Sequence, residues 1–296
     1  MAATSGRRTR LAVWVEAARP RTLTAAVTPV LVGSAAAGRV IAWRLAATLL
    51  VAVAVQVGVN YANDYFDAAK GVDTPARVGP RRAVAAGLVA PARMRDAMLA
   101  AFAVAAAAGT ALAAAAGWWL LVVGALCFAA AVGYSGGSRP YGSAGLGELF
   151  VFVFFGLVAT VGSAYVQAER VTAVAAAAAV PVGLLATAIL VANNLRDLAS
   201  DRDAGKRTLA VRLGAGRTRR LYAGLVAGAF LFVPAVAVAA DSPWPLLALA
   251  GLALARRPLA RVRAEATGPA LVGVLVATAR LQLGVGVLLA AGLALG

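Results

Sequence analysis

Long apolar segments of similar length alternate with short polar, Gly- or Pro-containing segments along most of the chain. Each apolar segment is close to the ~20 residues that a helix needs to cross the hydrocarbon core of a bilayer. The predicted spans are 23–42, 45–64, 97–116, 118–134, 147–166, 172–193, 221–240, 244–260 and 270–294. The pattern therefore predicts an all-α integral membrane protein with about nine transmembrane helices.

The composition favours the same class of protein. Of the 296 residues, 62% are hydrophobic and 14% are charged, and the mean hydropathy is +0.83. A soluble domain is about 45–50% apolar and about 25% charged. Histidine is absent, which excludes histidine acid–base catalysis, histidine-ligated haem and zinc sites that need histidine. The single cysteine, Cys127, cannot form an internal disulfide, so it indicates nothing about the redox compartment.

The basic residues lie mostly on one side of the predicted membrane. Of the 28 Lys and Arg residues, 24 fall in the N-terminal segment 1–21 or in the loops after the second, fourth, sixth and eighth spans, counting Arg256 and Arg257 at the end of the eighth span. Arg39, Arg44 and Arg170 fall on the other side, and Arg280 lies inside the last span. Because cytoplasmic loops carry the excess of Lys and Arg, the N-terminus is predicted to be cytoplasmic. Topology and anionic lipid headgroups then explain the formal charge of +16, and no nucleic acid partner is expected.

Six of the 12 acidic residues lie in two short clusters, both on the predicted cytoplasmic side. The clusters are 60–73, NYANDYFDAAKGVD, and 193–214, NNLRDLASDRDAGKRTLAVRLG. In each cluster one asparagine and two aspartates are spaced so that they share a helical face. These residues are Asn60, Asp64 and Asp67 in the first cluster and Asn193, Asp197 and Asp201 in the second. Asp73 and Asp203 lie past the predicted helix ends, off that face.

The two clusters also repeat a pattern. Asn-x3-Asp occurs at 60/64 and again at 193/197, 133 residues later. Such a repeat indicates two related helical halves that face each other across a central cavity. We therefore expect residues 1–296 to form a single transmembrane domain around a cavity.

The clusters have the chemistry of a metal–diphosphate site. Grouped carboxylates repel one another unless a cation lies between them, and Mg²⁺ characteristically takes one or two carboxylates together with water and substrate phosphates. Both lysines of the chain, Lys70 and Lys206, lie within the clusters, where a compact ammonium group suits phosphate oxygens. The Arg81–Arg82 pair is nearby. The alternative interpretation is an ordinary pattern of solvated charges at helix ends.

Several motifs resemble the UbiA superfamily of intramembrane prenyltransferases, and most closely its branch that prenylates 1,4-dihydroxy-2-naphthoate. NDYFDAAKGVD at 63–73 is similar to that branch's NDYxDxxxGxD pattern, and 193–214 is similar to NNxRDxxxDxxxGKxTLxxRxG. Three shorter stretches agree, namely RPRTL at 19–23, GPRRAVAAGL at 79–88 and YSGGSRPYGSAGLGE at 134–148. The resemblance implies a nine-helix fold in a cell membrane, with a cytoplasmic active site capped by the loops 65–96 and 194–220.

Carried over position by position, the resemblance implies three sets of site residues. The Mg²⁺ ligands would be Asn60, Asp64, Asp67, Asn193, Asp197 and Asp201. The diphosphate-binding residues would be Asn60, Lys70, Arg82, Arg139, Asn193 and Lys206. The catalytic residues would be Asp64, Asp67, Lys70, Tyr134, Asp197 and Asp201, with Tyr134 near the leaving group or the developing cation.

The implied reaction transfers a polyprenyl group from a polyprenyl diphosphate to 1,4-dihydroxy-2-naphthoate with loss of carbon dioxide, giving demethylmenaquinol in menaquinone biosynthesis. Positive charge around the leaving diphosphate assists its ionisation, and the allylic cation must be kept from water and is stabilised by aromatic faces. The aromatic candidates are Tyr65, Phe66, Phe150, Phe152, Phe154 and Phe155, with ordinary helix packing as the alternative for the phenylalanines. Arg19 and Arg21 are candidates for the acceptor's carboxylate, with anchoring at the membrane surface as their alternative.

Other functions are compatible with part of the pattern. Within the superfamily, the acceptor can instead be 4-hydroxybenzoate or another aromatic or lipid molecule. An ion-coupled transporter also has repeated halves and intramembrane carboxylates, but it would carry them near the bilayer midplane. A CDP-alcohol phosphotransferase would carry a DG-x2-AR pattern, which is absent. A nonenzymatic scaffold would leave the clustered metal-type ligands unexplained. Neither the prenyl chain length nor the oligomeric state follows from the sequence.

Overall fold

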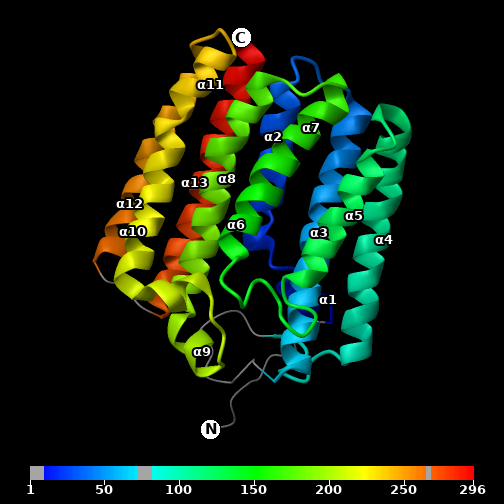
Figure 1. Ribbon diagram of the computed structural model, residues 1–296, viewed down its shortest axis with the longest axis vertical. Coiled ribbons are helices and arrows are strands. Elements are labelled where there is room, and N and C mark those ends of the chain that lie inside the picture. Colours follow the sequence, from blue (N-terminus) through cyan, green and yellow to red (C-terminus); the bar gives the residue numbers. More distant parts are fainter. Residues whose placement is uncertain (1–9, 72–81, 265–267) are drawn as a thin grey trace.

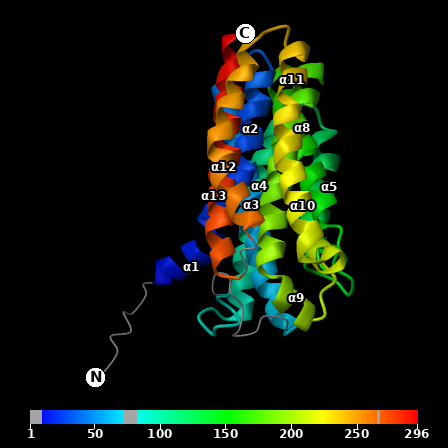
Figure 2. The same cartoon turned by 90° about the vertical axis from the view of Figure 1, so that its left-hand side faces the viewer.

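The chain is helical throughout the part that the structure describes. The computed structural model covers residues 10–71, 82–264 and 268–296, and in these ranges it contains helices and turns but no strand. Most helices run side by side as a tall bundle (Figures 1 and 2). The predicted all-α architecture is therefore confirmed for these residues.

The helices follow one another with short connections. They are α1 (Arg10–Ala18), η1 (Pro20–Thr22), α2 (Thr24–Ala36), α3 (Ala42–Ala69), α4 (Pro91–Ala116), α5 (Leu120–Gly133), α6 (Gly147–Val151), η2 (Phe152–Val158), α7 (Ala159–Ala168), α8 (Ala173–Arg196), α9 (Leu198–Asp203), α10 (Leu209–Leu231), α11 (Val233–Ala239), η3 (Trp244–Gly251), α12 (Leu252–Arg263) and α13 (Ala270–Leu295). Of these, η1 and η3 are 3-10 helices, and η2 is a π-helix.

Six helical segments are long and apolar enough to cross a membrane. They are Ala42–Ala69, Pro91–Ala116, Gly147–Ala168, Ala173–Arg196, Leu209–Ala239 and Ala270–Leu295. The helices α2 and α5 are apolar but shorter. The expected span 23–42 ends at Ala36 because the chain turns at Gly38, whose φ of 73° lies in the left-handed region that ends helices. The expected span 244–260 is divided between η3 and α12, whose last turn is basic. The structure thus supports about six crossing helices, and the count of nine and the cytoplasmic N-terminus stay predictions.

The helix α8 lies at the centre of the bundle. In its most apolar window 67% of the residues are buried, the highest share of the six segments, and it packs against α2, α10, α13 and η2. Glycines allow the closest of these approaches. A Cβ added at Gly156 of η2 would lie 2.6 Å from the Cα of Gly183 on α8. Since no side chain fits between them, these two glycines fix the distance between the helices.

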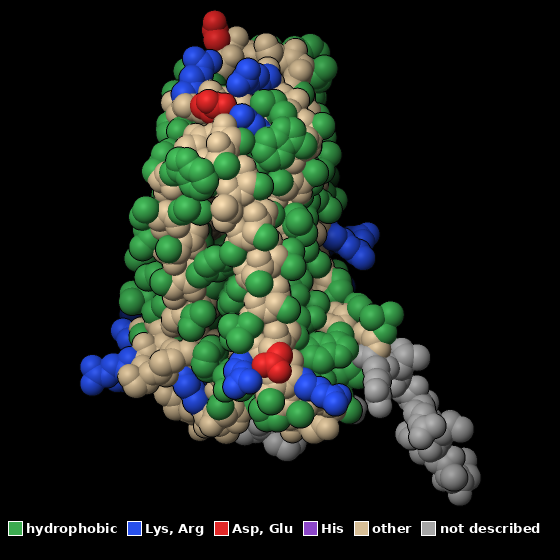
Figure 3. Space-filling view, turned by 90° about the vertical axis from the view of Figure 1, so that its right-hand side faces the viewer, with side chains coloured by type: hydrophobic (Ala, Val, Ile, Leu, Met, Phe, Trp, Pro, Cys, Tyr) green, Lys and Arg blue, Asp and Glu red, His purple; other side chains and the backbone are tan. Residues whose placement is uncertain are grey.

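The acidic clusters meet at one end of the bundle. The helices α3, α5 and α8 end there, at the bottom of Figure 1, and α9 and the turn 134–146 lie at the same end. The α2–α3 and α7–α8 connections and the C-terminus lie at the opposite end (Figure 1). On the face in Figure 3, charged side chains gather towards the two ends and hydrophobic side chains cover the middle, with one basic group at the side between them. This is the distribution expected of a bundle embedded in lipid.

The contact between Gly156 and Gly183 leads to a stability prediction. A Gly156→Ala substitution is expected to lower the free energy of unfolding by about 1–3 kcal/mol, because its methyl group must displace the backbone of α8. The matched control is Gly224→Ala on α10, where an added Cβ would meet no atom within 4 Å. That control is expected to be stabilising by about 0.5–1 kcal/mol, since alanine loses less backbone entropy in a helix. Thermal unfolding of both variants in the same detergent measures the difference in stability between them. Equal unfolding midpoints would contradict the close approach of η2 and α8 at Gly156.

Candidate active site

A small polar pocket of about 70 Å³ lies where α3, the turn after α5, α8 and α9 meet. Its position follows from where the helices end. The helix α3 stops before Gly71, whose φ of 66° turns the chain, and α8 is interrupted at Asp197 before the short α9 begins. Asn63 and Asp67 lie in the last two turns of α3, and Asn193, Asn194 and Asp197 lie at the end of α8, and all five line the pocket. Seven of the predicted site residues line the pocket, namely Asp67, Arg82, Tyr134, Asn193, Asp197, Asp201 and Lys206.

Asp67 connects the two acidic clusters. Its carboxylate accepts a hydrogen bond from Nη2 of Arg82 at 2.9 Å and from Nζ of Lys206 at 3.4 Å. The aspartate and Arg82 are both buried. A buried carboxylate is stabilised only by opposite charge and hydrogen bonds. Loss of Asp67 or of its cations would therefore leave an uncompensated charge at the site. The pairing holds the segment after α9 against the end of α3.

The second cluster is held by a buried arginine that the sequence patterns had not singled out. Arg196 donates to both carboxylate oxygens of Asp197, at 2.7 and 2.6 Å, and to Oδ1 of Asn193 at 2.9 Å. The forked guanidinium suits two parallel bonds to a carboxylate. Asp201, one turn of α9 later, faces the same pocket.

Four predicted site residues do not line the polar pocket. The carboxylate of Asp64 accepts the backbone N–H groups of Ala83 and Val84, at 2.9 and 3.0 Å, so it holds the loop that carries Arg82. Asn60 donates to the carbonyl of Ala18 at 2.9 Å and lies in the wall of the apolar cavity described below. Two exposed residues remain.

Lys70 and Arg139 are the two exposed residues, and neither side chain lines the polar pocket. Lys70 donates to the carbonyl of Ser135, which attaches the end of α3 to the turn after α5. Arg139 is exposed on that turn. Asp73 and Arg81 lie outside the described residues.

Asn63 is a pocket residue that the sequence patterns missed. It is buried, it lines the polar pocket, and its Oδ1 has no hydrogen-bond partner. A signal for it was present, because Asn63 and Asp67 have the same Asn-x3-Asp spacing as Asn193 and Asp197, 130 residues later. The pocket therefore contains two similar Asn-x3-Asp pairs. The first pair is Asn63 and Asp67, about one helical turn after the expected pair Asn60 and Asp64. Ser135, Ser143, Asn194 and Thr208 complete the polar lining.

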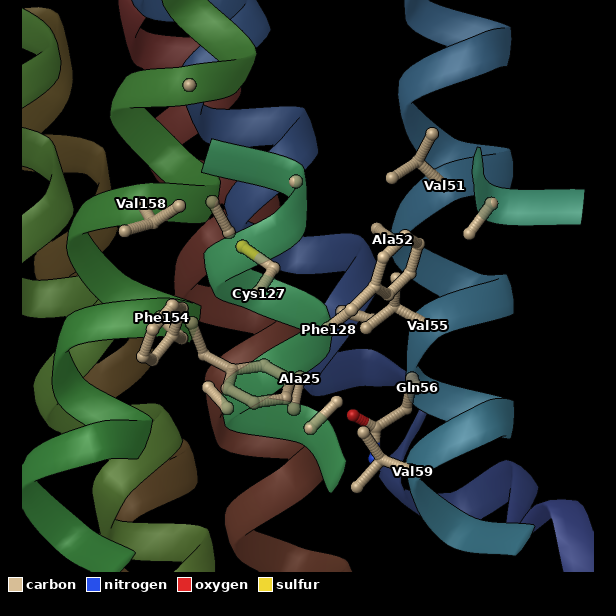
Figure 4. Close-up of a pocket in the computed structure, with 18 of the residues that line it drawn as sticks. Ala25, Val51, Ala52, Val55, Gln56, Val59, Cys127, Phe128, Phe154 and Val158 are labelled. Atoms are coloured by element: carbon tan, nitrogen blue, oxygen red, sulfur yellow. The ribbon is translucent and has the colours of Figure 1, made fainter. Parts of the chain in front are cut away.

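A larger apolar cavity of about 510 Å³ adjoins the polar pocket. Residues of α2, α3, α4, α5, η2, α7 and α8 line it, and Figure 4 shows part of this wall, with Val51, Val55 and Val158 facing the space. Four residues line both the pocket and the cavity: Arg19, Asn63, Tyr134 and Asn193. They form a junction at which a polar group and a hydrocarbon chain of one molecule have separate environments.

A row of aromatic rings leads from the junction along the cavity wall. Tyr134 packs edge-on against Tyr141 at 5.5 Å between centroids, Tyr141 stacks on Phe150 at 3.9 Å, and Phe150 stacks on Phe154 at 5.9 Å. Burial raises the pKa of Tyr141 above its ordinary value, and its hydroxyl donates to the carbonyl of Ala130 at 2.7 Å. Phe155 also lines the cavity.

The other aromatic candidates lie elsewhere. Phe152 packs beside Gly183, and Phe66 packs beside Gly136. Tyr65 packs against a small core cluster of α1, α4 and the loop between α3 and α4. None of these three lines the cavity or the pocket.

The donor set fits a cation that shares its ligands with a phosphate. Within the described ranges no group of three or more His, Cys, Asp or Glu side chains is arranged to hold a metal ion. The pocket instead offers three carboxylates and the unpartnered amide oxygen of Asn63, a buried oxygen that a hard cation would satisfy. Because Mg²⁺ usually completes its coordination with water and substrate phosphates, this incomplete set suits it.

Comparison with known proteins gives consistent matches. The sequence model of the UbiA prenyltransferase family matches residues 26–267. The 1,4-dihydroxy-2-naphthoate octaprenyltransferase of Mycobacterium tuberculosis is 47% identical over 269 residues, covering 89% of this chain and 90% of that protein. The Escherichia coli protein of the same name is 38% identical over 231 residues, covering 75% of each.

Two solved structures share the fold. The apo structure of a UbiA homologue from Aeropyrum pernix has a TM-score of 0.69 at 15% identity, covering 92% of this chain and 96% of that chain. A UbiA homologue from Archaeoglobus fulgidus, bound to GPP and Mg²⁺, has a TM-score of 0.64 at 14% identity, covering 94% of this chain and 99% of that chain. At these identities the similarity concerns the fold alone.

The different contacts of the two neighbouring aspartates predict different defects. In an Asp64→Asn variant, hydrogen exchange at the amides of Ala83 and Val84 is expected to become about tenfold faster, because those amides lose charge-assisted bonds. In an Asp67→Asn variant the same amides are expected to stay protected. Hydrogen–deuterium exchange with peptide-level mass spectrometry measures both, and equal deprotection in the two variants would contradict the separate roles.

Proposed function

The chain belongs to the UbiA prenyltransferase family, and from that premise we propose that it transfers a polyprenyl group from an allylic polyprenyl diphosphate to 1,4-dihydroxy-2-naphthoate, with loss of carbon dioxide. It is a multi-pass membrane protein and a prenyltransferase. The observation that carries it is the junction between the polar pocket and the apolar cavity. A prenyl diphosphate has one anionic end and one hydrocarbon end, which are the two environments that meet there.

The donor diphosphate would lie in the polar pocket. We assign Asn63, Asp67, Asn193, Asp197 and Asp201 as the groups that hold Mg²⁺, because these residues line the pocket. Asn60 and Asp64, the other two expected ligands, do not line the pocket. Nδ2 of Asn60 donates to the carbonyl of Ala18, and the carboxylate of Asp64 accepts the loop amides. Mg²⁺ bound there would partly neutralise the negative charge that develops on the leaving diphosphate.

Cations of the chain would bind the phosphate oxygens. Lys206 and Arg82 both contact Asp67, and a diphosphate entering the pocket offers them stronger anionic partners. Their donors would stabilise the charge that develops on the leaving oxygen as the allylic C–O bond breaks. Asp67, released from its cations, is then available to the metal. Lys70 and Arg139 would act only if the loops close over a bound donor.

The allylic carbon would lie at the junction, beside Tyr134. Its neighbours on the wall are the stacked Tyr141 and Phe150, whose ring faces stabilise positive charge. The apolar lining of the cavity excludes water from the cation, which would otherwise be captured as an alcohol. The electron-rich acceptor ring then forms the new carbon–carbon bond, and its carboxylate leaves as carbon dioxide.

The acceptor's carboxylate would bind Arg19. This residue lines both the pocket and the cavity, and its φ of 53° is a left-handed conformation that is costly for a residue with a side chain. The conformation turns the chain between α1 and η1 at the mouth of the cavity. Arg21 is exposed and does not line either space. We place the mouth on the cytoplasmic side, with the loops 65–96 and 194–220 over it, on the basis of the positive charge there.

The test is a transfer assay with purified protein in lipid nanodiscs. With a polyprenyl diphosphate and Mg²⁺, we expect prenylated naphthoquinol without its carboxylate from 1,4-dihydroxy-2-naphthoate, detected by mass spectrometry, and little product from 4-hydroxybenzoate. Chelation of divalent cations is expected to abolish product. An Asp67→Asn, Asp197→Asn double variant is expected to lose at least 100-fold in rate, because it removes two charges from the metal site.

Two controls decide between the alternatives. Product from 4-hydroxybenzoate alone would retain the fold and the chemistry but reject the naphthoate acceptor. Product without divalent cation, or from the double variant at an unchanged rate, would reject the assignment of the polar pocket as the diphosphate site.

A further inference from the structure

One face of α3 carries polar side chains from the polar pocket down into the apolar cavity. Asp67 and Asn63 line the pocket, and Asn60 and Gln56 line the cavity below them. Gln56 lies two turns from Asn63, about 10 Å along the helix axis. Its neighbours in the cavity wall include Ala25, Val55, Val59 and Phe128, all of them apolar (Figure 4).

The amide oxygen of Gln56 is buried without a partner. The residue is 8% exposed, and its Oε1 accepts no hydrogen bond. Figure 4 shows this oxygen directed into the cavity, away from the helix that carries it. It shares its lack of a partner with Oδ1 of Asn63, the oxygen that faces the polar pocket.

Three hydroxyl groups of the same wall are satisfied without a ligand. The hydroxyls of Thr48, Thr110 and Ser163 each donate to the carbonyl four residues earlier in their own helix, at 2.7, 2.8 and 2.6 Å. Such bonds satisfy a hydroxyl inside an apolar environment. The amide oxygen of Gln56 has no such partner in its own helix, so a donor on a molecule in the cavity would satisfy it once the side chain turns to meet that donor.

An unpaired buried acceptor is unfavourable, and a ligand that donates to it removes the penalty. The prenyl tail has no donor. The acceptor does have one, because its ring carries two hydroxyl groups, one next to the carboxylate and one on the opposite side of that ring. If the carboxylate binds Arg19, which lines both the polar pocket and the cavity, the second hydroxyl would lie on the cavity side, where Gln56 is part of the wall.

We propose that Gln56 accepts a hydrogen bond from the acceptor hydroxyl that is not adjacent to the carboxylate, and that it thereby selects and positions a dihydroxylated aromatic acid for attack on the allylic carbon. The inference rests on the proposed function, since it requires an acceptor in this cavity. Gln56 is a positioning residue, because it touches the acceptor without taking part in a bond that forms or breaks.

The experiment compares two ligands on two proteins. Dissociation constants of 1,4-dihydroxy-2-naphthoate and 1-hydroxy-2-naphthoate are measured by ligand fluorescence, with the protein in nanodiscs holding Mg²⁺ and an unreactive thiodiphosphate donor analogue. The wild type is expected to bind the dihydroxy acid about three- to tenfold more tightly than the monohydroxy acid. Gln56→Met, which keeps the length of the side chain without its oxygen, is expected to bind the two acids equally. Its affinity for the monohydroxy acid should match that of the wild type.

A matched control separates this effect from the loss of a buried amide. Gln282 on α13 is also buried, both of its amide atoms lack partners, and it does not line the cavity. Gln282→Met is expected to keep the wild-type preference between the acids. Thermal unfolding should show Gln56→Met to be as stable as the wild type or more so, because an unsatisfied polar group has been removed. If that variant does not fold, Gln56→Leu takes its place.

The outcomes distinguish the inference from the function on which it rests. A wild-type preference that persists in the Gln56 variant, or an equal loss of affinity for both acids, would overturn the role of Gln56 while leaving prenyl transfer intact. Absence of transfer to the dihydroxy acid by the wild type would overturn the proposed function itself. In kinetics, the variant should raise the KM for the acceptor and leave the KM for the donor unchanged.

Discussion

The buried carboxylate of Asp67 must be neutralised at the edge of an apolar cavity, and the site is organised around that requirement. Water cannot neutralise it there, so Arg82 and Lys206 do. These cations come from two different loops, and both loops must therefore fold against the end of α3. The same arrangement explains why the pocket suits an anionic ligand. A diphosphate that brings its own cation can exchange partners with Asp67, Arg82 and Lys206 without leaving any charge uncompensated.

The apolar cavity depends on how unevenly the helices are spaced. At Gly156 and Gly183 the backbones nearly touch, so the wall on that side is firmly packed. The neighbouring η2 is a π-helix, whose wider turn changes the direction of the side chains along it. Phe154, Phe155 and Val158 consequently face the cavity while Phe152 packs against α8. The cavity is thus a consequence of backbone geometry on both sides of η2 as well as of small residues on α3, α4 and α5.

The acceptor end of the reaction has fewer polar contacts than the donor end. Charged side chains dominate in the pocket, where several of them would bind the proposed diphosphate. In the cavity, the proposed acceptor contacts are only Arg19 and Gln56, and apolar surroundings strengthen each hydrogen bond that such groups would make.

Much of the protein was accessible from its sequence. Hydropathy is a local property, so the all-helical class, six of the long spans and the position of both acidic clusters at helix ends could be predicted. The motifs of the family also named Asp67, Asn193, Asp197, Asp201, Arg82 and Lys206, all of which line the pocket. The tertiary structure decided the rest, because helical spacing alone is ambiguous.

Positions three and four residues apart share a helical face, so Asn60, Asn63 and Asp64 were equally plausible partners of Asp67. The choice depends on neighbours far away in the sequence. Ala18 takes the amide of Asn60, the amides of the loop at Ala83 take Asp64, and only Asn63 is left facing the pocket. Gln56 likewise looks like one polar residue in an apolar helix until the other helices enclose a cavity beside it. The sequence determined which chemistry is present at the end of the bundle, and long-range packing determined which atoms can perform it.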